Sequence, residues 1–156
     1  MKTFIYLDID GVLCLGSEIH PKLTEWGYVH RFNHRAVQMF NEILEKTNAD
    51  IIISSDWKDH YTLEDFKGIF EWQKVIKYPI DTTSSLPNKT LQLLEEFRAK
   101  EILEHVDKYK PRHWVAIDDL DLRYWIPDKH FVLTPRWMEG IKQTGKKQEI
   151  INKLTL

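Results

Sequence analysis

The sequence predicts an α/β fold in three layers, with a central parallel sheet covered by helices on both faces. Two observations carry this prediction. Short apolar runs typical of buried strands alternate along the chain with segments whose apolar residues recur at helical spacing. The chain has 156 residues, enough for one domain with a sizeable core, and no repeat, low-complexity tract or linker divides the sequence. We therefore expect residues 1–156 to form a single domain.

Four apolar segments are predicted to be the strands of the sheet. Each is short and apolar on both sides of the backbone, as expected for parallel strands that are buried on both faces. The segments are Phe4–Leu7, Ile51–Ser54, one in the string HWVAIDD and one in the string HFVLT. Helices between these strands would cover both faces of the sheet.

Four segments are predicted to be helices. Asn33 is a typical N-cap, and the apolar residues that follow it recur at helical spacing. Thr62, with Asp65 three residues later, indicates a second capped helix. The predicted segments are the one that begins after Asn33, residues 62–72, residues 89–107 with a break near Arg98, and the one from about Thr144 to about Leu154. Between the first strand and the first helix, residues 12–32 are predicted to form an irregular excursion or a hairpin, and residues 79–88 a loop.

Composition narrows the classes of protein. The net charge of -2, with many charges of both signs, gives no general signal for binding polyanions. The one cysteine, Cys14, excludes a disulfide within the chain and suits a reducing compartment. The first apolar stretch is too short for a signal peptide, and no run reaches the roughly 18 apolar residues of a membrane span. We expect a soluble, cytoplasmic protein with no membrane partner.

Two aspartates, Asp8 and Asp10, follow the first predicted strand and are themselves followed by Gly11. Like charges this close repel each other, and burying either is costly unless a partner compensates the charge. A simple turn is one alternative, because Asp-Gly is a common turn pair. A calcium-binding EF-hand loop is excluded, because no glycine stands at the position that such a loop requires.

Polar residues follow three of the predicted strands. In open α/β sheets the ligand site lies beyond the carboxyl ends of the strands, so these residues are expected to meet at one edge. They are Asp8 and Asp10, Ser54 and Ser55, and Asp118 and Asp119. Four converging carboxylates need a cation, and a ligand set made only of oxygens favours Mg²⁺ over zinc or copper. The sequence thus predicts a magnesium site.

The strings DIDGV, IIISS, a lysine and then VAIDD, in this order and strand context, resemble the haloacid dehalogenase (HAD) superfamily of aspartate-nucleophile phosphotransferases. The strings ISSDWK, IDDLD and FVLT further resemble the small HAD domains associated with RNA-repair proteins. The resemblance implies a Rossmann-like fold with a single HAD-like hydrolase domain. The segment 12–32 lies where the superfamily carries its flap, and no insert is long enough for a large cap, so the cap should be minimal.

The resemblance also implies a role for each matching residue. Asp8 would be the nucleophile and Asp10 the general acid and base, both catalytic. Ser54, with Ser55 as a second contact or a mere turn hydroxyl, would bind the transferring phosphoryl group. Asp119, helped by Asp118, would hold Mg²⁺ together with the carboxylate of Asp8 and the backbone carbonyl of Asp10. An aspartate two residues after the nucleophile favours phosphate chemistry over dehalogenation, because a leaving halide needs no proton.

Sites of this kind need a cation to hold phosphate and nucleophile together, and three side chains compete for that role. Lys100 is favoured, because it stands about a helix's length before Asp118. Arg98 is second, because the string RAKEI resembles the narrower family's pattern, which has an arginine there. Lys89, near a predicted helix start, is third. A solvated helix lysine is the ordinary alternative for each lysine.

The substrate is the least defined part of the prediction. Candidates for touching the leaving group lie in the string EWGYVHR, although a hairpin that packs its own aromatics explains them equally well: Trp26, Tyr28, His30 and Arg31. Basic residues near the C-terminus would form either a phosphate-backbone footprint or a solvated helix face: Arg136, Lys142, Lys146, Lys147 and Lys153. Nucleic-acid ends, nucleotides and small phosphometabolites all remain open as phosphorylated substrates.

The favoured function is a Mg²⁺-dependent phosphomonoesterase that acts through an aspartyl-phosphate intermediate. One alternative within enzymes is a phosphotransferase that passes the phosphoryl group to an acceptor other than water. A second alternative is a non-catalytic module that binds a phosphorylated ligand or another protein. The presence of both Asp8 and Asp10 argues against this module, since binding alone does not require the pair.

Overall fold

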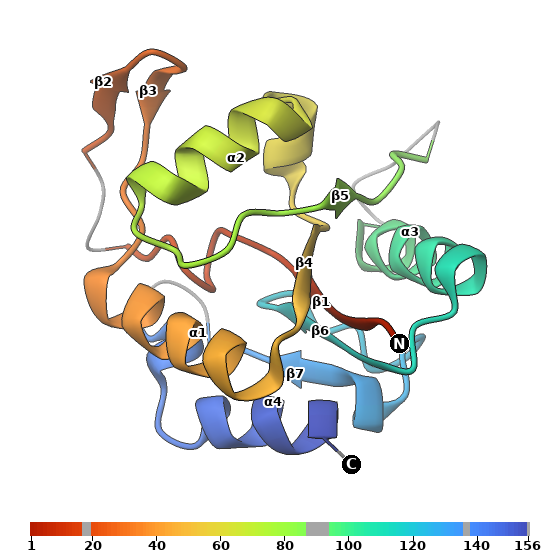
Figure 1. The fold of residues 1–156 in the computed structure, drawn as a ribbon. Coiled ribbons are helices and arrows are strands. Elements are labelled where there is room, and N and C mark those ends of the chain that lie inside the picture. Colours follow the sequence, from red (N-terminus) through yellow and green to blue (C-terminus); the bar gives the residue numbers. More distant parts are fainter. Residues whose placement is uncertain (17–19, 87–93, 136–137, 156) are drawn as a thin grey trace.

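The computed structural model describes residues 1–16, 20–86, 94–135 and 138–155 (Figure 1). In this part of the chain, five parallel strands form the central sheet in the order β5-β4-β1-β6-β7, with helices on both faces. The predicted α/β, Rossmann-like fold class is therefore confirmed. The strands are β1 (Thr3–Leu7), β4 (Asp50–Ile53), β5 (Asp81–Thr82), β6 (His113–Asp118) and β7 (Phe131–Leu133).

Strand β5 was not predicted, because it lies inside the segment 79–88 that reads as a loop. Two residues are too few to show the periodicity by which a strand is recognised. Backbone hydrogen bonds nevertheless extend the edge of the sheet on either side of β5. The amide of Ile80 donates to Ile51, and the amide of Thr83 donates to Ile53.

The helix caps follow the sequence. Asn33 accepts from the amide of Ala36 and begins α1 (His34–Thr47), which ends at a left-handed Asn48. Thr62 and Asp65 form the predicted capping box of α2 (Leu63–Trp72). The last helix, α4, spans Lys146–Thr155.

Helix α3 (Leu94–Tyr109) corrects one prediction. It runs without a break through Arg98, whose side chain is buried. The helical pattern is weak there because α3 also buries Glu101 and His105, so its buried face carries polar residues. Residues 87–93, including the predicted helix start at residue 89, lie outside the described part of the chain.

Each face of the sheet has its own core. Ile5 and Leu7 of β1 face a core shared with α1, α2 and α4. Phe4 and Tyr6 face the opposite way, toward α3 and the segment that follows β6. Successive side chains of β1 thus point to opposite faces of the sheet, as expected for a strand that is buried on both sides. No helix in the described residues is long and apolar enough to span a membrane.

The segment 12–32 contains a small antiparallel hairpin of β2 (Lys22–Thr24) and β3 (Gly27–Val29), which stands beside α2 (Figure 1). Trp26, in its turn, packs against α2 where Gly68 leaves room; a Cβ at position 68 would overlap the indole ring. The hairpin is thus packed against the domain by its own aromatic residue.

Candidate active site

The three central strands end in register. Leu7 of β1 pairs with the last residue of β4 and with Ile117 of β6. The next residue of each strand, Asp8, Ser54 and Asp118, therefore lies at the same carboxyl edge of the sheet. The amide of Asp8 donates to the β6 carbonyl of Ile117 at 3.0 Å, and the amide of Ser54 donates to Leu7 at 3.0 Å. The register of the three strands therefore brings these polar residues together at one edge, as predicted.

Three carboxyl groups gather at this edge. Asp8 and Asp118 are buried and Asp119 is half-buried, and one oxygen from each lies within 4.8 Å of the others. Burial raises the pKa of Asp8 well above its ordinary value, and repulsion from Asp118 and Asp119 adds to this effect. The neighbouring Arg98 and a backbone amide only partly offset the rise. The cluster therefore has an excess of negative charge that a divalent cation could compensate.

Arg98 from α3 is the cation that the fold brings to the cluster. Its guanidinium lies 2.7 Å from Asp118, 3.4 Å from Asp8 and 3.1 Å from Asp56, and its side chain is only 5% exposed. Burial alone would lower the pKa of Arg98, but these carboxylates, Asp118 first, outweigh burial and raise it. The guanidinium is charged at any physiological pH and neutralises part of the buried acid.

The two serines after β4 have different surroundings. Among the residues described, the Ser54 hydroxyl is a buried side-chain polar atom with no hydrogen-bond partner. Such an atom is costly unless a ligand or water satisfies it. The Ser55 hydroxyl accepts from the amide of Trp57 at 3.2 Å and caps the short 3₁₀ helix η1 (Asp56–Asp59). Ser54 thus offers a free hydroxyl to a ligand, whereas Ser55 has a structural role in the turn.

Asp10 lies at the rim of the cluster with an exposed side chain, and its Oδ2 accepts from the Trp57 indole at 3.1 Å. The next residue, Gly11, has φ +78°, and a Cβ at this position would overlap the carboxyl group of Asp119. Thr134, after β7, donates from its hydroxyl to the Gly11 carbonyl at 2.9 Å. No role at the site was predicted for Thr134, which ends the string FVLT, because its contact with Gly11 depends on how β7 lies beside β6.

A family model described as the HAD domain in Swiss Army Knife RNA repair proteins matches residues 4–144. The chain belongs to this family. The match covers the sheet from Phe4 of β1 onward together with the acidic cluster, so the resemblance predicted from the strings around Asp8, Ser54 and Asp118 is confirmed. No curated protein matches the chain significantly, and no solved structure does.

The structure of this HAD domain separates the candidates for the cation. Lys100 is two residues from Arg98 on α3, about 200° around the helix, and therefore lies on another face. Its side chain is 55% exposed and pairs with Glu96 at 2.9 Å. Lys100, the favoured candidate, is not brought to the cluster, and the second candidate, Arg98, is. Lys89 lies outside the described residues.

The other residues predicted to contact a substrate are Tyr28 and several basic side chains, and most of the basic ones pair or stack with residues of this HAD domain. Arg31 stacks its guanidinium 3.7 Å above the Trp72 ring and donates to the Trp72 carbonyl at 3.0 Å. Tyr28 of the hairpin is 69% exposed. The C-terminal lysines pair with carboxylates: Lys142 with Glu139, Lys146 with Glu149, Lys147 with Glu42, and Lys153 with Asp128 and Glu149. Arg136 lies outside the described residues. This pairing favours a solvated helix face over a phosphate-backbone footprint.

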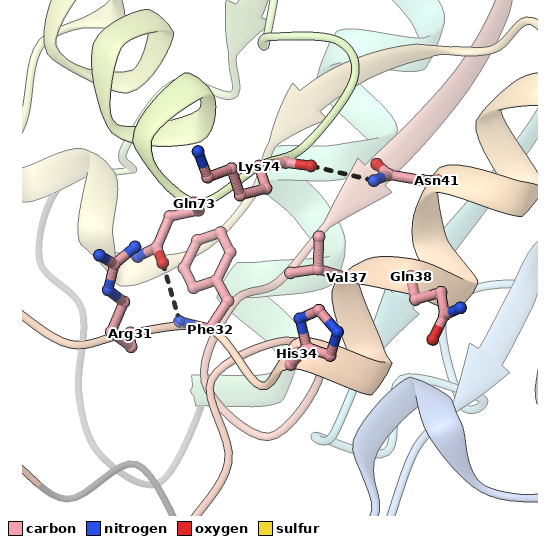
Figure 2. Close-up of a pocket in the computed structure, with 8 residues that line it drawn as sticks. All are labelled: Arg31, Phe32, His34, Val37, Gln38, Asn41, Gln73 and Lys74. Atoms are coloured by element: carbon pink, nitrogen blue, oxygen red, sulfur yellow. Dashed lines mark hydrogen bonds between the residues drawn. The ribbon is translucent and has the colours of Figure 1, made fainter.

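A cleft of about 490 Å³ lies between the start of α1 and the end of α2 (Figure 2). The side chains of Phe32 and Val37 contribute apolar surface to it. Gln73 accepts from the Phe32 amide at 3.0 Å, and Asn41 donates to the Lys74 carbonyl at 3.0 Å. The lining of this cleft includes none of the acidic cluster, and its amide groups join α1 to the chain after α2.

Proposed function

We propose that this HAD domain is a Mg²⁺-dependent phosphomonoesterase that forms an aspartyl-phosphate on Asp8. The observation that carries the proposal is the arrangement at the carboxyl edge of the sheet. There the buried Asp8 lies beside Arg98 and the other two carboxyl groups, and next to it in register is the Ser54 hydroxyl, which has no hydrogen-bond partner among the described residues. Membership of a HAD family supports a hydrolase-like enzyme of this kind.

The proposed reaction has two steps. An oxygen of Asp8 bonds to phosphorus while the bond from phosphorus to the leaving oxygen breaks, and Asp10 gives the leaving oxygen a proton. Water then bonds to phosphorus as the bond to Asp8 breaks, and Asp10 takes a proton from that water. Ser54 and Arg98 would bind the oxygens of the phosphoryl group, with Ser54 donating the hydrogen bond that it makes to no described residue.

Magnesium fits the donor set of the cluster. All the donors are oxygens, and the guanidinium that pairs with Asp8 and Asp118 also pairs with Asp56. The residues that would hold the ion are Asp8, Asp118 and Asp119, together with the backbone carbonyl of Asp10. When bound, Mg²⁺ supplies positive charge that offsets the repulsion between a carboxylate and a phosphate dianion.

We expect Mg²⁺ to raise the thermal midpoint of the wild-type protein, because an ion that binds only the folded cluster stabilises the folded state. At a Mg²⁺ concentration 100 times its Kd, the gain is about 2.7 kcal/mol. The measurement is a thermal melt with Mg²⁺ and with a chelator, alongside turnover of a panel of phosphate esters under the same two conditions. The chelator should abolish turnover.

The variant D119N should lose the stabilisation by Mg²⁺. The matched control is D121N, because Asp121 stands two residues further along, is exposed and pairs with Arg123 rather than with the cluster. A wild-type midpoint that does not respond to Mg²⁺, or an equal response in both variants, would contradict the metal site.

The substrate class that we favour is a phosphorylated nucleic-acid end. The family description places related domains in RNA-repair proteins, and the described residues between β1 and α1 form no larger element than a small hairpin. A phosphorylated oligonucleotide should therefore have a higher kcat/KM than the matching mononucleotide, and its advantage should shrink as salt rises. A preference for the mononucleotide, or rates that do not depend on salt, would instead indicate a small phosphometabolite.

A further inference from the structure

The indole nitrogen of Trp57 donates to Oδ2 of Asp10 at 3.1 Å. Asp10 comes from the turn after β1, whereas Trp57 comes from η1 after β4, 47 positions further along the chain. This hydrogen bond is the contact by which the segment after β4 reaches the proposed proton-transfer residue. No part of the mechanism described so far uses it.

The two partners differ in how firmly they are held. Trp57 is 9% exposed, and its ring centroid lies 5.8 Å from that of Phe32 and 5.8 Å from that of Tyr61. Its backbone amide is also fixed by the Ser55 hydroxyl. Asp10 is exposed, and an exposed carboxyl group on its own can turn about its side-chain bonds. The direction of the bond is therefore set by the buried tryptophan.

The indole N–H only donates, so the oxygen that faces it must accept. A carboxyl proton on Asp10 then belongs on the other oxygen, Oδ1. We infer that Trp57 is a positioning residue that assigns proton transfer in this site to Oδ1 of Asp10. The inference rests on the proposed function, because it takes Asp10 as the residue that transfers protons. The hydrogen bond between Trp57 and Asp10 is independent of that function.

The proposed steps balance with this assignment. In the first step, the proton on Oδ1 moves to the leaving oxygen as its bond to phosphorus breaks and the bond from Asp8 to phosphorus forms. In the second, a water oxygen bonds to phosphorus, the bond from Asp8 to phosphorus breaks, and a water proton returns to Oδ1. Oδ2 keeps the indole hydrogen bond throughout, so Asp10 does not need to rotate between the steps.

The ordinary alternative is that Asp10 merely satisfies a buried indole N–H. The variant W57F separates the two readings, because phenylalanine keeps an aromatic ring in the packing but has no N–H. The control is W114F, since Trp114 is 6% exposed, belongs to the core on the other side of the sheet and stacks on His130. Both variants should lower the thermal midpoint, which reports lost stability and not the position of a proton.

The first experiment tests the hydrogen bond without using activity. In ¹H–¹⁵N NMR spectra, the indole cross-peak that disappears in W57F identifies Trp57. We expect this peak to shift in D10A and to stay in place in D121A, which removes an exposed carboxyl group outside the cluster. A peak that is unmoved in D10A would overturn the inference whether or not the protein is a phosphatase.

The second experiment tests the consequence for catalysis by comparing two leaving groups. A primary alkyl phosphate needs a proton on its leaving oxygen, whereas 4-nitrophenyl phosphate leaves as a stable anion. The ratio kcat/KM reports the step up to loss of the leaving group. W57F should lower kcat/KM for the alkyl ester about tenfold, which is less than the roughly 10²–10⁴-fold that general acid catalysis contributes in full, and should leave the aryl ester almost unchanged.

A double-variant cycle completes the test. D10N, which removes the proton donor itself, should show a larger loss with the same preference for the alkyl ester, and adding W57F to D10N should cost nothing further, because the two residues act through one proton. Equal losses of kcat/KM for both esters in W57F, or no loss, would overturn the role of Trp57. The proposed function would still be supported in that case by turnover of the wild type and by the effect of D10N. If the wild-type protein showed no Mg²⁺-dependent turnover, the proposed function would be contradicted. The NMR experiment would then still test the hydrogen bond between Trp57 and Asp10.

Discussion

The variant D8N is expected to lose turnover by at least about 10³-fold while the folded state stays as stable as the wild type, or becomes more stable, without metal. The loss follows because an amide oxygen is a poor nucleophile toward phosphorus. The stability follows from the raised pKa of Asp8: at neutral pH the fold disfavours its ionised form, through burial first and repulsion from Asp118 and Asp119 second. A neutral asparagine removes that cost. Turnover and a thermal melt in chelator measure the two effects.

Two outcomes would contradict this assignment. Turnover near the wild-type level in D8N would show that Asp8 is not the nucleophile. A much lower thermal midpoint in D8N would show that its ion pair with Arg98 at 3.4 Å outweighs the cost of burying the carboxylate. D8N should lose transfer to an added alcohol together with hydrolysis, because both reactions need the same nucleophile. The phosphotransferase alternative is therefore tested in the wild-type protein, by adding an alcohol as acceptor.

The acidic side of the site was predictable because it follows from strand order alone. Parallel strands bring their carboxyl ends to one edge, so the residues after three apolar runs had to meet there. The fixed pairing of Leu7 with its two neighbours made Asp8, Ser54 and Asp118 adjacent without further information. The same reasoning does not apply to a residue on a helix, because its direction depends on how the helix is rotated.

The cation was not predictable for this reason. Arg98 and Lys100 differ by about 200° around α3, and the rotation of a helix is normally inferred from its apolar face. Beside the apolar Ala99 and Ile102, the buried face of α3 carries Arg98, Glu101 and His105, so apolar spacing alone does not define it. Each finds its partner on another element: Arg98 at the cluster, Glu101 with Lys58 at 3.2 Å, and His105 with Asp81 at 2.8 Å. These partners come close to α3 only when the chain is folded, so the sequence alone does not identify them.

Trp57 illustrates a second limit. From the sequence, Trp57 could stack on a substrate, but a tryptophan at the edge of the core is the favoured interpretation, because its ring is apolar although its nitrogen is polar. The structure shows that it is both buried and hydrogen-bonded to Asp10. Sequence spacing carries no information on the direction of a single N–H group.

The variant R98M is expected to cause the largest loss of stability of any single substitution discussed. Arg98 contacts three carboxyl groups, two of them buried, and its removal leaves Asp8 and Asp118 without their main compensating charge. Breaking a buried ion pair by removing one partner typically costs about 3–5 kcal/mol. A thermal or denaturant melt in chelator measures this loss. K100M is the matched control and should change the midpoint little, because Lys100 is exposed and pairs only with Glu96 among the described residues.

The variant R98K keeps the prediction testable if R98M does not fold. Lysine retains the charge but not the planar group that reaches Asp118, Asp8 and Asp56 together, so R98K should be intermediate in stability and weaker than the wild type in phosphate binding. Mg²⁺ should recover part of the stability that R98K loses, because the ion compensates the same carboxylates. If R98K and R98M both proved as harmless as K100M in stability and in KM, Arg98 would not be the cation of this site, because neither its charge nor its three contacts would then contribute.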